Sequence, residues 1–181
     1  MGKEIYMSVA LSAPDITRAL IRISHEILEA NPSTHQITLL GIPTRGAHLA
    51  RRIAISMSEI AGHEIPVGTL DITMHRDDLR LRPPRPIMPT SIPHGGVDGR
   101  EIVLIDDVLF SGRTIRAALD ALGEIGRPHT VQLAALVDRG HRELPIRADF
   151  VGKNLPTSIT QSVKVHLSEI DGLDEVLIEG N

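Results

Sequence analysis

Apolar side chains recur along this chain with the two spacings that helices and strands require. In three segments they return every three or four residues, which predicts helices with one buried face. These faces are Ile16, Leu20, Ile23 and Ile27; Ala50, Ile53, Ala54 and Met57; and Ile115, Ala118, Leu119 and Leu122. The first helix also has defined ends, because Ser12 and Asp15 fit a capping box and Asn31-Pro32 stops the chain from continuing as a helix.

Between these helices lie short apolar segments of strand type. Residues 37–41, 102–105 and 131–137 are apolar with little interruption, which predicts buried strands. Residues 69–74 alternate between polar and apolar side chains, and Val163, Val165 and Leu167 alternate likewise, so both segments are expected to be half-exposed strands. Residues 80–99 are rich in proline, glycine and arginine and are expected to form a mobile loop or a β-ribbon.

Strands that alternate with helices predict an α/β fold, with a mostly parallel sheet flanked by helices. The length of 181 residues fits a single domain over residues 1–181. Ligands of such sheets bind beyond the carboxyl ends of the strands, where the loops 43–46, 107–113 and 138–147 are expected to meet.

The strand that ends near Ile105 leads directly into two acids, Asp106 and Asp107. A small-residue loop with Ser111-Gly112 then precedes a helix. Backbone N–H groups and the dipole of a helix N-terminus hold phosphate, and carboxylates accept hydrogen bonds from sugar hydroxyls. This arrangement therefore suits a sugar phosphate. The alternatives are an ordinary strand with a polar rim and an acid/base pair for hydrolysis.

Three further segments carry charged residues, but on the residues alone each can be explained without a functional site. Taken alone, Arg45 in the turn 43–46 is a surface residue between a strand and a helix. The loop 138–147 is a solvated charged loop by its composition. Arg18, Arg22 and His25 share one side of the first helix, which on the residues alone is an exposed face.

Composition narrows the class of protein. Aromatic residues make up only 2% of the chain, which disfavours a nucleic-acid reader that works by stacking, and the net charge of -4 means that RNA would need a local basic patch. The absence of cysteine excludes disulfides and thiolate catalysis. None of the nine histidines has the spacing of a metal site. We expect a cytoplasmic protein that does not enter membranes, since no signal-like or membrane-length apolar run is present.

The segment from Glu101 to Thr114 resembles the 5-phosphoribosyl-1-pyrophosphate (PRPP) motif of type I phosphoribosyltransferases. Residues 71–79, 108–114, 136–152 and 152–158 resemble the PyrR family, and the likeness runs from about Ile16 to about Leu167. The resemblance implies the type I phosphoribosyltransferase fold with a small hood formed by the terminal segments. It also implies a uracil phosphoribosyltransferase, which converts uracil and PRPP to UMP and pyrophosphate with Mg²⁺ that arrives on PRPP rather than in a protein metal site.

The resemblance assigns the site residue by residue. Catalysis would involve Arg45, Asp106 and Asp107. PRPP or UMP would be bound by Thr44, Arg45, Gly46, Arg76, Asp106, Asp107, Val108, Leu109, Phe110, Ser111, Gly112, Arg113 and Thr114. Uracil would lie near Arg139 and Val163. Pro43 departs from the family, where a basic residue is frequent, and this leaves one fewer cation near pyrophosphate.

PyrR proteins also bind the leader messenger RNA of pyrimidine operons in a UMP-dependent manner, as homodimers or larger homo-oligomers. The matching positions here are Arg18, Arg22, His25, His141, Arg142 and Arg147. Two alternatives remain: an RNA-binding regulator with little catalytic activity, and a phosphoribosyltransferase for another base.

Overall fold

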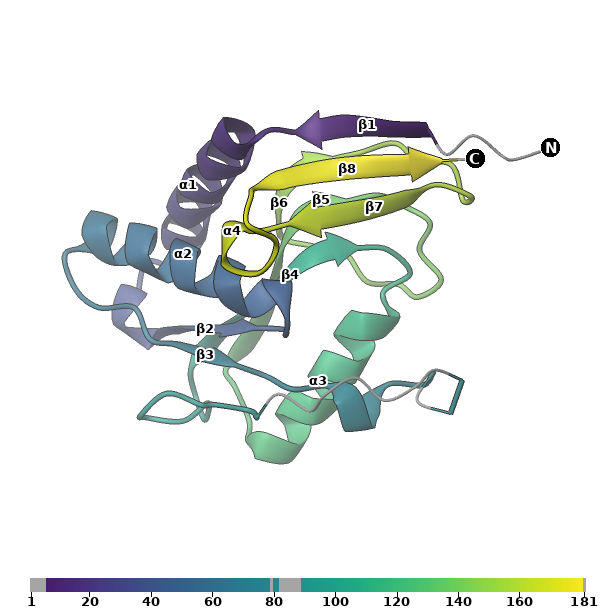
Figure 1. Ribbon diagram of the computed structural model, residues 1–181. Coiled ribbons are helices and arrows are strands. Elements are labelled where there is room, and N and C mark those ends of the chain that lie inside the picture. Colours follow the sequence, from purple (N-terminus) through teal and green to yellow (C-terminus); the bar gives the residue numbers. More distant parts are fainter. Residues whose placement is uncertain (1–5, 79, 82–88, 181) are drawn as a thin grey trace.

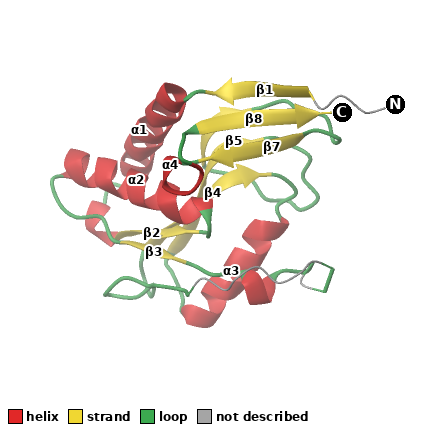
Figure 2. Cartoon of the chain, in the orientation of Figure 1, coloured by secondary structure: helices red, strands yellow, loops and turns green. Residues whose placement is uncertain are grey.

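The chain forms a five-stranded parallel sheet with helices on both faces, which confirms the predicted α/β fold (Figures 1 and 2). The computed structural model describes residues 6–78, 80–81 and 89–180. The strand order is β3-β2-β4-β5-β6. Its strands are β2 (Ile37–Gly41), β3 (Val67–Thr69), β4 (Glu101–Leu109), β5 (Thr130–Asp138) and β6 (Phe150–Asn154).

Two apolar layers fill the space between the sheet and its helices. Helices α1 (Ala13–Ala30) and α2 (Arg45–Ala61) pack together on one face, over a core that includes Ile23, Leu49 and Val103. Helix α3 (Arg113–Ile125) covers the other face through Ile115 and Leu122. Figure 1 shows α3 on the opposite side of the sheet from α1 and α2.

A second, antiparallel sheet of order β1-β8-β7 forms a hood above the first layer. It consists of β1 (Tyr6–Leu11), β7 (Ser162–His166) and β8 (Glu175–Gly180), with the short helix α4 (Ser168–Asp171) between the last two. Strands from both ends of the described chain thus form it, as expected. Val165 and Val176 of the hood are buried in the same core as α1 and α2.

The helices follow the sequence pattern closely. Helix α1 has the expected capping box, with the Ser12 and Asp15 side chains each accepting from the other's backbone N–H group. Leu119 is the exception among the predicted core positions of the helices, since it is 42% exposed. In the predicted buried strand 131–137, Val131 is likewise exposed, at 39%.

The strand predicted over residues 69–74 is wrong beyond Thr69. Strand β3 ends there, and a 3₁₀ turn occupies Thr73–His75. The carboxylate of Asp71 accepts hydrogen bonds from the backbone N–H and the hydroxyl of Thr73 at 3.1 and 2.7 Å, a local turn that competes with strand pairing. Leu70 and Ile72 are nevertheless buried, whereas Met74 is 67% exposed.

Residues 82–88, the centre of the expected loop or ribbon, lie outside the described residues. Near them, Ser91 forms an antiparallel bridge with Thr69, so the chain returns to the edge of the sheet at that point.

Candidate active site

The acid pair lies within β4 rather than beyond it, because the strand continues to Leu109. Asp106 is only 6% exposed. Its carboxylate accepts the backbone N–H of Asp107 at 2.9 Å, and the Asp107 carboxylate accepts that of Val108 at 2.8 Å. Burial, followed by the neighbouring charge of Asp107, raises the pKa of Asp106 well above its usual value.

The loop after β4 leads into α3 through a glycine that the backbone requires. Gly112 has a φ of +94°, and a Cβ there would meet the Ile146 side chain at 3.3 Å. The carbonyl of Ser111 accepts the backbone N–H groups of Glu143 and Leu144 at 2.9 and 3.1 Å, so the loop 138–147 packs directly against it. Helix α3 begins at Arg113 beside the acid pair. Its N-cap residue, Gly112, has no side chain that could cap the helix, and the Ser111 hydroxyl accepts the Arg113 backbone N–H at 3.3 Å.

Two glycines allow α2 to begin against the ends of β2 and β4. A Cβ on Gly41 would lie 2.4 Å from the Gly46 carbonyl oxygen, and one on Gly46 would lie 2.5 Å from that of Ile105. The peptide bond between Pro43 and Thr44 is cis. This packing places Thr44 and Arg45, at the start of α2, next to the carboxylates of β4.

Two adjoining cavities of about 250 and 320 Å³ form one cleft over these elements. Arg76, Asp106, Val108 and Thr114 line both. The first is completed by Ile42, Pro43, Thr44, Arg45, Asp71, Ile72, Thr73 and Asp107. The second is completed by Asp77, Asp78, Leu109, Phe110, Ser111, Gly112, Arg113, Ile115 and Glu143. The cleft thus brings together nearly all the residues expected to bind PRPP, with Gly46 just behind them in the first turn of α2.

The cationic groups of the cleft are held by acids of the protein. Arg76 donates to Asp78 at 2.8 and 3.0 Å, and this contact raises the pKa of Arg76. Arg113 bridges Asp77 and Glu143 at 2.7 Å each. Hydrogen bonds to Glu143 and then to Asp77 raise the pKa of Arg113.

The two residues expected near uracil do not line either cavity. Arg139 is 7% exposed and donates to the Thr157 hydroxyl and to the carbonyls of Ser158 and Gln161 at 2.7–3.2 Å. Its guanidinium stacks on Phe110 at 4.1 Å from the ring centre, and burial lowers its pKa. Arg139 therefore shapes the segment 157–161. Val163, in β7, packs against the core below the hood.

The residues expected to contact RNA fall into two groups on opposite sides of the sheet. Arg18, Arg22 and His25 are exposed on α1. Arg147 is exposed beside α3, with Leu119 and Ile115 of that helix lining the same shallow pocket. The structure does not gather the two groups into one surface of a single chain.

Three of these side chains are already engaged within the protein. Arg22 donates to the carbonyls of Val151 and Gly152 at 3.2 and 2.5 Å. Arg142 donates to the carbonyls of Phe110 and Ile146 and to the Asp138 carboxylate, which fixes the loop 138–147. The His141 Nε2 lies 2.6 Å from the Thr157 carbonyl oxygen.

Sequence reasoning missed several residues of the cleft, namely Asp71, Ile72, Thr73, Asp77 and Glu143. The spacing of Asp71 and Thr73 is that of an Asx turn, a local signal that could have replaced the strand prediction. Within the described ranges, no three His, Asp or Glu side chains are grouped so that they could hold a metal ion. None of the helices described is long and apolar enough to cross a membrane.

Comparison with known proteins identifies the family. A model of the phosphoribosyl transferase domain matches residues 10–170. The Bifunctional protein PyrR of Streptomyces coelicolor is 64% identical over 168 residues, which cover 93% of this chain and 87% of that protein. The protein of the same name from Chloroflexus aurantiacus is 57% identical and covers 93% of this chain and 92% of its own length.

The fold itself recurs in more distant proteins. A solved structure of Trypanosoma cruzi hypoxanthine phosphoribosyl transferase superposes with a TM-score of 0.73 and covers 98% of this chain and 93% of that chain. A hypoxanthine phosphoribosyltransferase from Staphylococcus aureus superposes with a TM-score of 0.69, and the match covers 93% of this chain and 90% of that chain. Identities of 12% and 15% make these likenesses of fold alone, and they confirm the type I phosphoribosyltransferase arrangement.

Proposed function

Since the chain belongs to the phosphoribosyl transferase domain family, and within it to the PyrR proteins, we propose that it transfers a phosphoribosyl group from PRPP to uracil and binds pyrimidine-operon leader RNA. The products of the transfer are UMP and pyrophosphate. The observation that carries the catalytic proposal is the cleft that two adjacent carboxylates line together with the N-termini of α2 and α3.

The 5-phosphate of PRPP binds at residues 110–114, where the N–H groups at the start of α3 and the hydroxyls of Ser111 and Thr114 face the second cavity. The carboxylates of Asp106 and Asp107 accept hydrogen bonds from the ribose hydroxyls. These contacts fix the sugar between the two helix N-termini, so that the reacting carbon is oriented before the base arrives.

Pyrophosphate leaves toward α2. The Thr44–Gly46 segment provides backbone N–H groups, and Arg45 provides a guanidinium that suits a polyanion. The carboxylates of Asp106 and Asp107 and the hydroxyl oxygens of Thr44 and Thr114 line the cleft and fit Mg²⁺, which would be held near them together with PRPP. It would supply positive charge for the leaving pyrophosphate. The protein's own share is to hold both ends of PRPP and to stabilise that charge with Arg45.

Uracil binds on the hood side of the cleft, toward the segment 157–161 and Val163. Arg139 acts there through the carbonyls of Ser158 and Gln161, which it holds in place. Arg76, which lines both cavities, helps to exclude water from the bound substrates.

Turnover of uracil and PRPP, followed by release of UMP, tests the catalytic proposal. Asp107→Asn should fold normally, because the amide oxygen still accepts the Val108 N–H group. It should weaken PRPP use by about 1.5–3 kcal/mol, the contribution of a hydrogen bond to a charged group. Asp120→Asn, on the exposed side of α3, is the matched control and should behave as the wild type.

Two results of this assay would favour the alternatives. Wild-type protein that binds leader RNA but turns over no base would be a regulator without catalysis. Faster turnover of hypoxanthine or guanine than of uracil would assign another base.

The regulatory part of the proposal is supported by basic side chains at the surface, of which Arg18, Arg22, His25 and Arg147 are exposed and His141 and Arg142 are half-buried. Arg18, Arg22 and His25 form one RNA-binding group on α1, and His141, Arg142 and Arg147 form the other. UMP bound in the cleft favours the RNA-competent state, so by linkage RNA should tighten UMP binding by the same factor. Homodimers or larger assemblies combine the two groups.

A further inference from the structure

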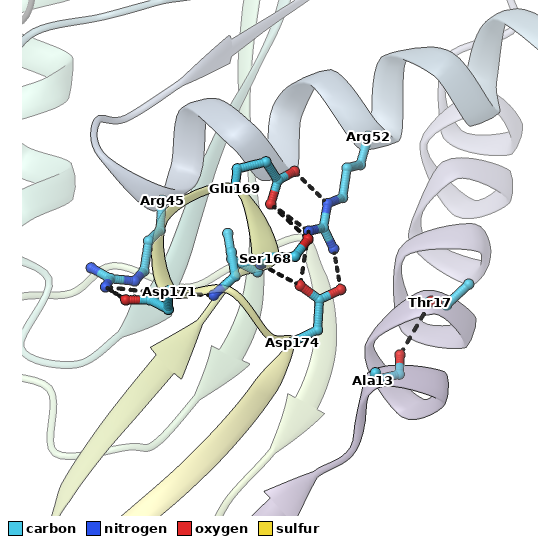
Figure 3. Close-up of polar contacts among 9 residues, drawn as sticks. Ala13, Thr17, Arg45, Arg52, Ser168, Glu169, Asp171 and Asp174 are labelled. Carbon is cyan, nitrogen blue, oxygen red and sulfur yellow. Dashed lines mark hydrogen bonds and ion pairs between the residues drawn. The ribbon is translucent and has the colours of Figure 1, made fainter.

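Two arginines of α2 connect the active site to the hood. Arg45 and Arg52 are seven residues apart, so they project from the same side of the helix, and both reach the short helix α4 (Figure 3). Arg45 donates through Nη2 to both carboxylate oxygens of Asp171 at 3.0 and 3.1 Å. Arg52 lies between Glu169 and Asp174, with Nε 2.8 Å from Glu169 and Nη1 2.7 Å from Asp174.

The two contacts have different surroundings. Arg52 is absent from the lining of the cleft, and hydrogen bonds to Asp174 and Glu169 raise its pKa, so it serves as a clamp between α2 and the hood. Arg45 lines the cleft on the side where pyrophosphate is proposed to leave. Its contact with Asp171 therefore bears on ligand binding, whereas that of Arg52 bears on the packing of α4.

Asp171 is fixed without the help of Arg45. Its Oδ2 accepts the backbone N–H of Leu167 at 2.8 Å, across the first turn of α4. That backbone bond, and next the hydrogen bond from Arg45, lower the pKa of Asp171. The carboxylate is thus a charged acceptor in a fixed place, and the flexible partner is the arginine.

Arg45 keeps donors free for a ligand. Only Nη2 contacts Asp171, and Nε is buried without a hydrogen-bond partner among the residues described. A buried donor left unsatisfied is costly, which indicates that the pose is completed when an anion occupies the cleft.

We propose that Asp171 is a positioning residue that holds Arg45 in the orientation in which its remaining N–H groups bind the pyrophosphate of PRPP. This inference rests on the proposed function. A free arginine side chain loses rotamer entropy when it is immobilised, and a guanidinium that Asp171 already holds loses less on binding. Asp171 stays in contact with Arg45 while PRPP is bound and does not compete with it.

Asp171→Asn tests the proposal. The amide lacks the negative charge and one of the two acceptor oxygens that Arg45 contacts, and its NH₂ group would face a donor. We expect the KM for PRPP and the inhibition constant of pyrophosphate to rise about tenfold, as for the loss of a charge-assisted contact. The KM for uracil should stay unchanged.

Two controls separate positioning from packing. Glu169→Gln weakens the contact of Arg52 with the same short helix. It should leave the KM for PRPP and the inhibition constant of pyrophosphate unchanged. In the Arg45→Ala background, Asp171→Asn should add nothing further to the loss of PRPP affinity measured by calorimetry. Asp171→Glu keeps the charge and should recover part of the affinity. If Asp171→Asn fails to fold, Asp171→Glu takes its place both alone and in the double variant with Arg45→Ala.

Some outcomes would overturn the inference and leave the proposed function intact. The first is an unchanged inhibition constant of pyrophosphate in Asp171→Asn. The second is a rise of that constant in Glu169→Gln as large as in Asp171→Asn. The third is a further loss of PRPP affinity when Asp171→Asn is added to Arg45→Ala. Tighter pyrophosphate binding in Asp171→Asn would show competition instead of positioning. Wild-type protein that turns over no uracil with PRPP would refute the proposed function itself, which distinguishes the two failures.

Discussion

At the scale of single residues, the carboxyl group of Asp106 is poorly suited to its surroundings. It is 6% exposed and adjoins a second carboxylate, and both conditions disfavour its charged form. The folded protein offers this carboxylate the Asp107 N–H group as a donor. Under the proposed function, the ribose hydroxyls of PRPP would supply further donors, so the ligand would relieve a group that destabilises the free protein.

Asp106→Asn should stabilise the free protein in a pH-dependent way. The pKa of Asp106 is raised above its ordinary value of 3.8, so the folded state holds the proton more tightly than the unfolded state. Below the ordinary pKa this group costs the fold nothing. As the pH rises through the raised pKa, the wild type loses stability relative to the variant. The gain at neutral pH should be about 0.5–2 kcal/mol, a few degrees in Tm.

Thermal melts of both proteins between about pH 5 and pH 8 measure this effect. The difference in Tm should grow with pH, while PRPP turnover by the variant falls. A difference that is constant across the range would mean that ionisation of Asp106 does not affect the stability of the fold.

At the scale of elements, the sequence predicted best what local patterns encode. The helices carry long apolar faces, and the capping box at Ser12 defines a start, so α1, α2 and α3 appear where expected. Strands β1, β6 and β8 were missed. Strand β6 is five residues long and contains Gly152, where a Cβ would lie 2.4 Å from the Leu136 carbonyl oxygen. A glycine required by this close approach lowers the local strand signal.

The residues of the site also divide into those that a local pattern predicts and those that it does not. Residues 106–114 are contiguous, so one motif predicts them together. The fold alone brings in three other residues: Asp71 and Glu143, which line the cleft, and Asp171, which contacts Arg45. Their partners are far away in the sequence. Arg45 and Asp171, for example, are 126 positions apart. Local spacing carries no signal for such pairs. Arg139 shows the converse, since its position was predicted but its side chain acts through the segment 157–161.

The close approach of α2 to β4 yields a prediction about two glycines. Gly46→Ala would place a Cβ 2.5 Å from the Ile105 carbonyl oxygen, so α2 must move away from the acid pair. We expect a loss of about 1–3 kcal/mol of stability and a loss of turnover. Gly123→Ala, in α3, has open space around its Cβ and should stabilise the protein by about 0.4–1 kcal/mol.

Urea unfolding of the two variants, with PRPP turnover measured in parallel, makes the comparison. Equal stability of the two variants would show that α2 can shift without cost. Normal turnover by Gly46→Ala would show that catalysis tolerates a movement of Thr44 and Arg45 away from the acid pair.

At the scale of the whole molecule, the two basic groups pose a geometric problem. The α1 group lies on the face of the five-stranded sheet that α1 and α2 cover, whereas Arg147 lies beside α3, so the two groups are not side by side in one chain. Two chains related by a twofold axis bring them together if α1 of one protomer and the loop of its partner form a common surface. We therefore propose that the RNA-binding surface forms between two protomers.

Arg18 and Arg147 are the suitable probes of that surface. Arg18 is exposed and pairs with its neighbour Asp15, and Arg147 is exposed, whereas Arg22 and Arg142 also hold the backbone together. Each loss of a phosphate contact should lower the salt slope of RNA binding by about one. Arg116→Ala, on the exposed side of α3, is the control and should leave the slope unchanged.

Mixing the two variants then tests whether the surface is shared between chains. In a mixed dimer of Arg18→Ala and Arg147→Ala, one composite surface carries both substitutions and the other carries neither. Random exchange gives roughly half mixed dimers, so leader RNA binding with the wild-type salt slope should reappear in about that share of the protein. If each surface belonged to one chain, every surface in the mixture would keep one substitution. Gel-shift titrations of the mixture against the separate variants would then show no recovery, and the two-chain RNA surface would be excluded.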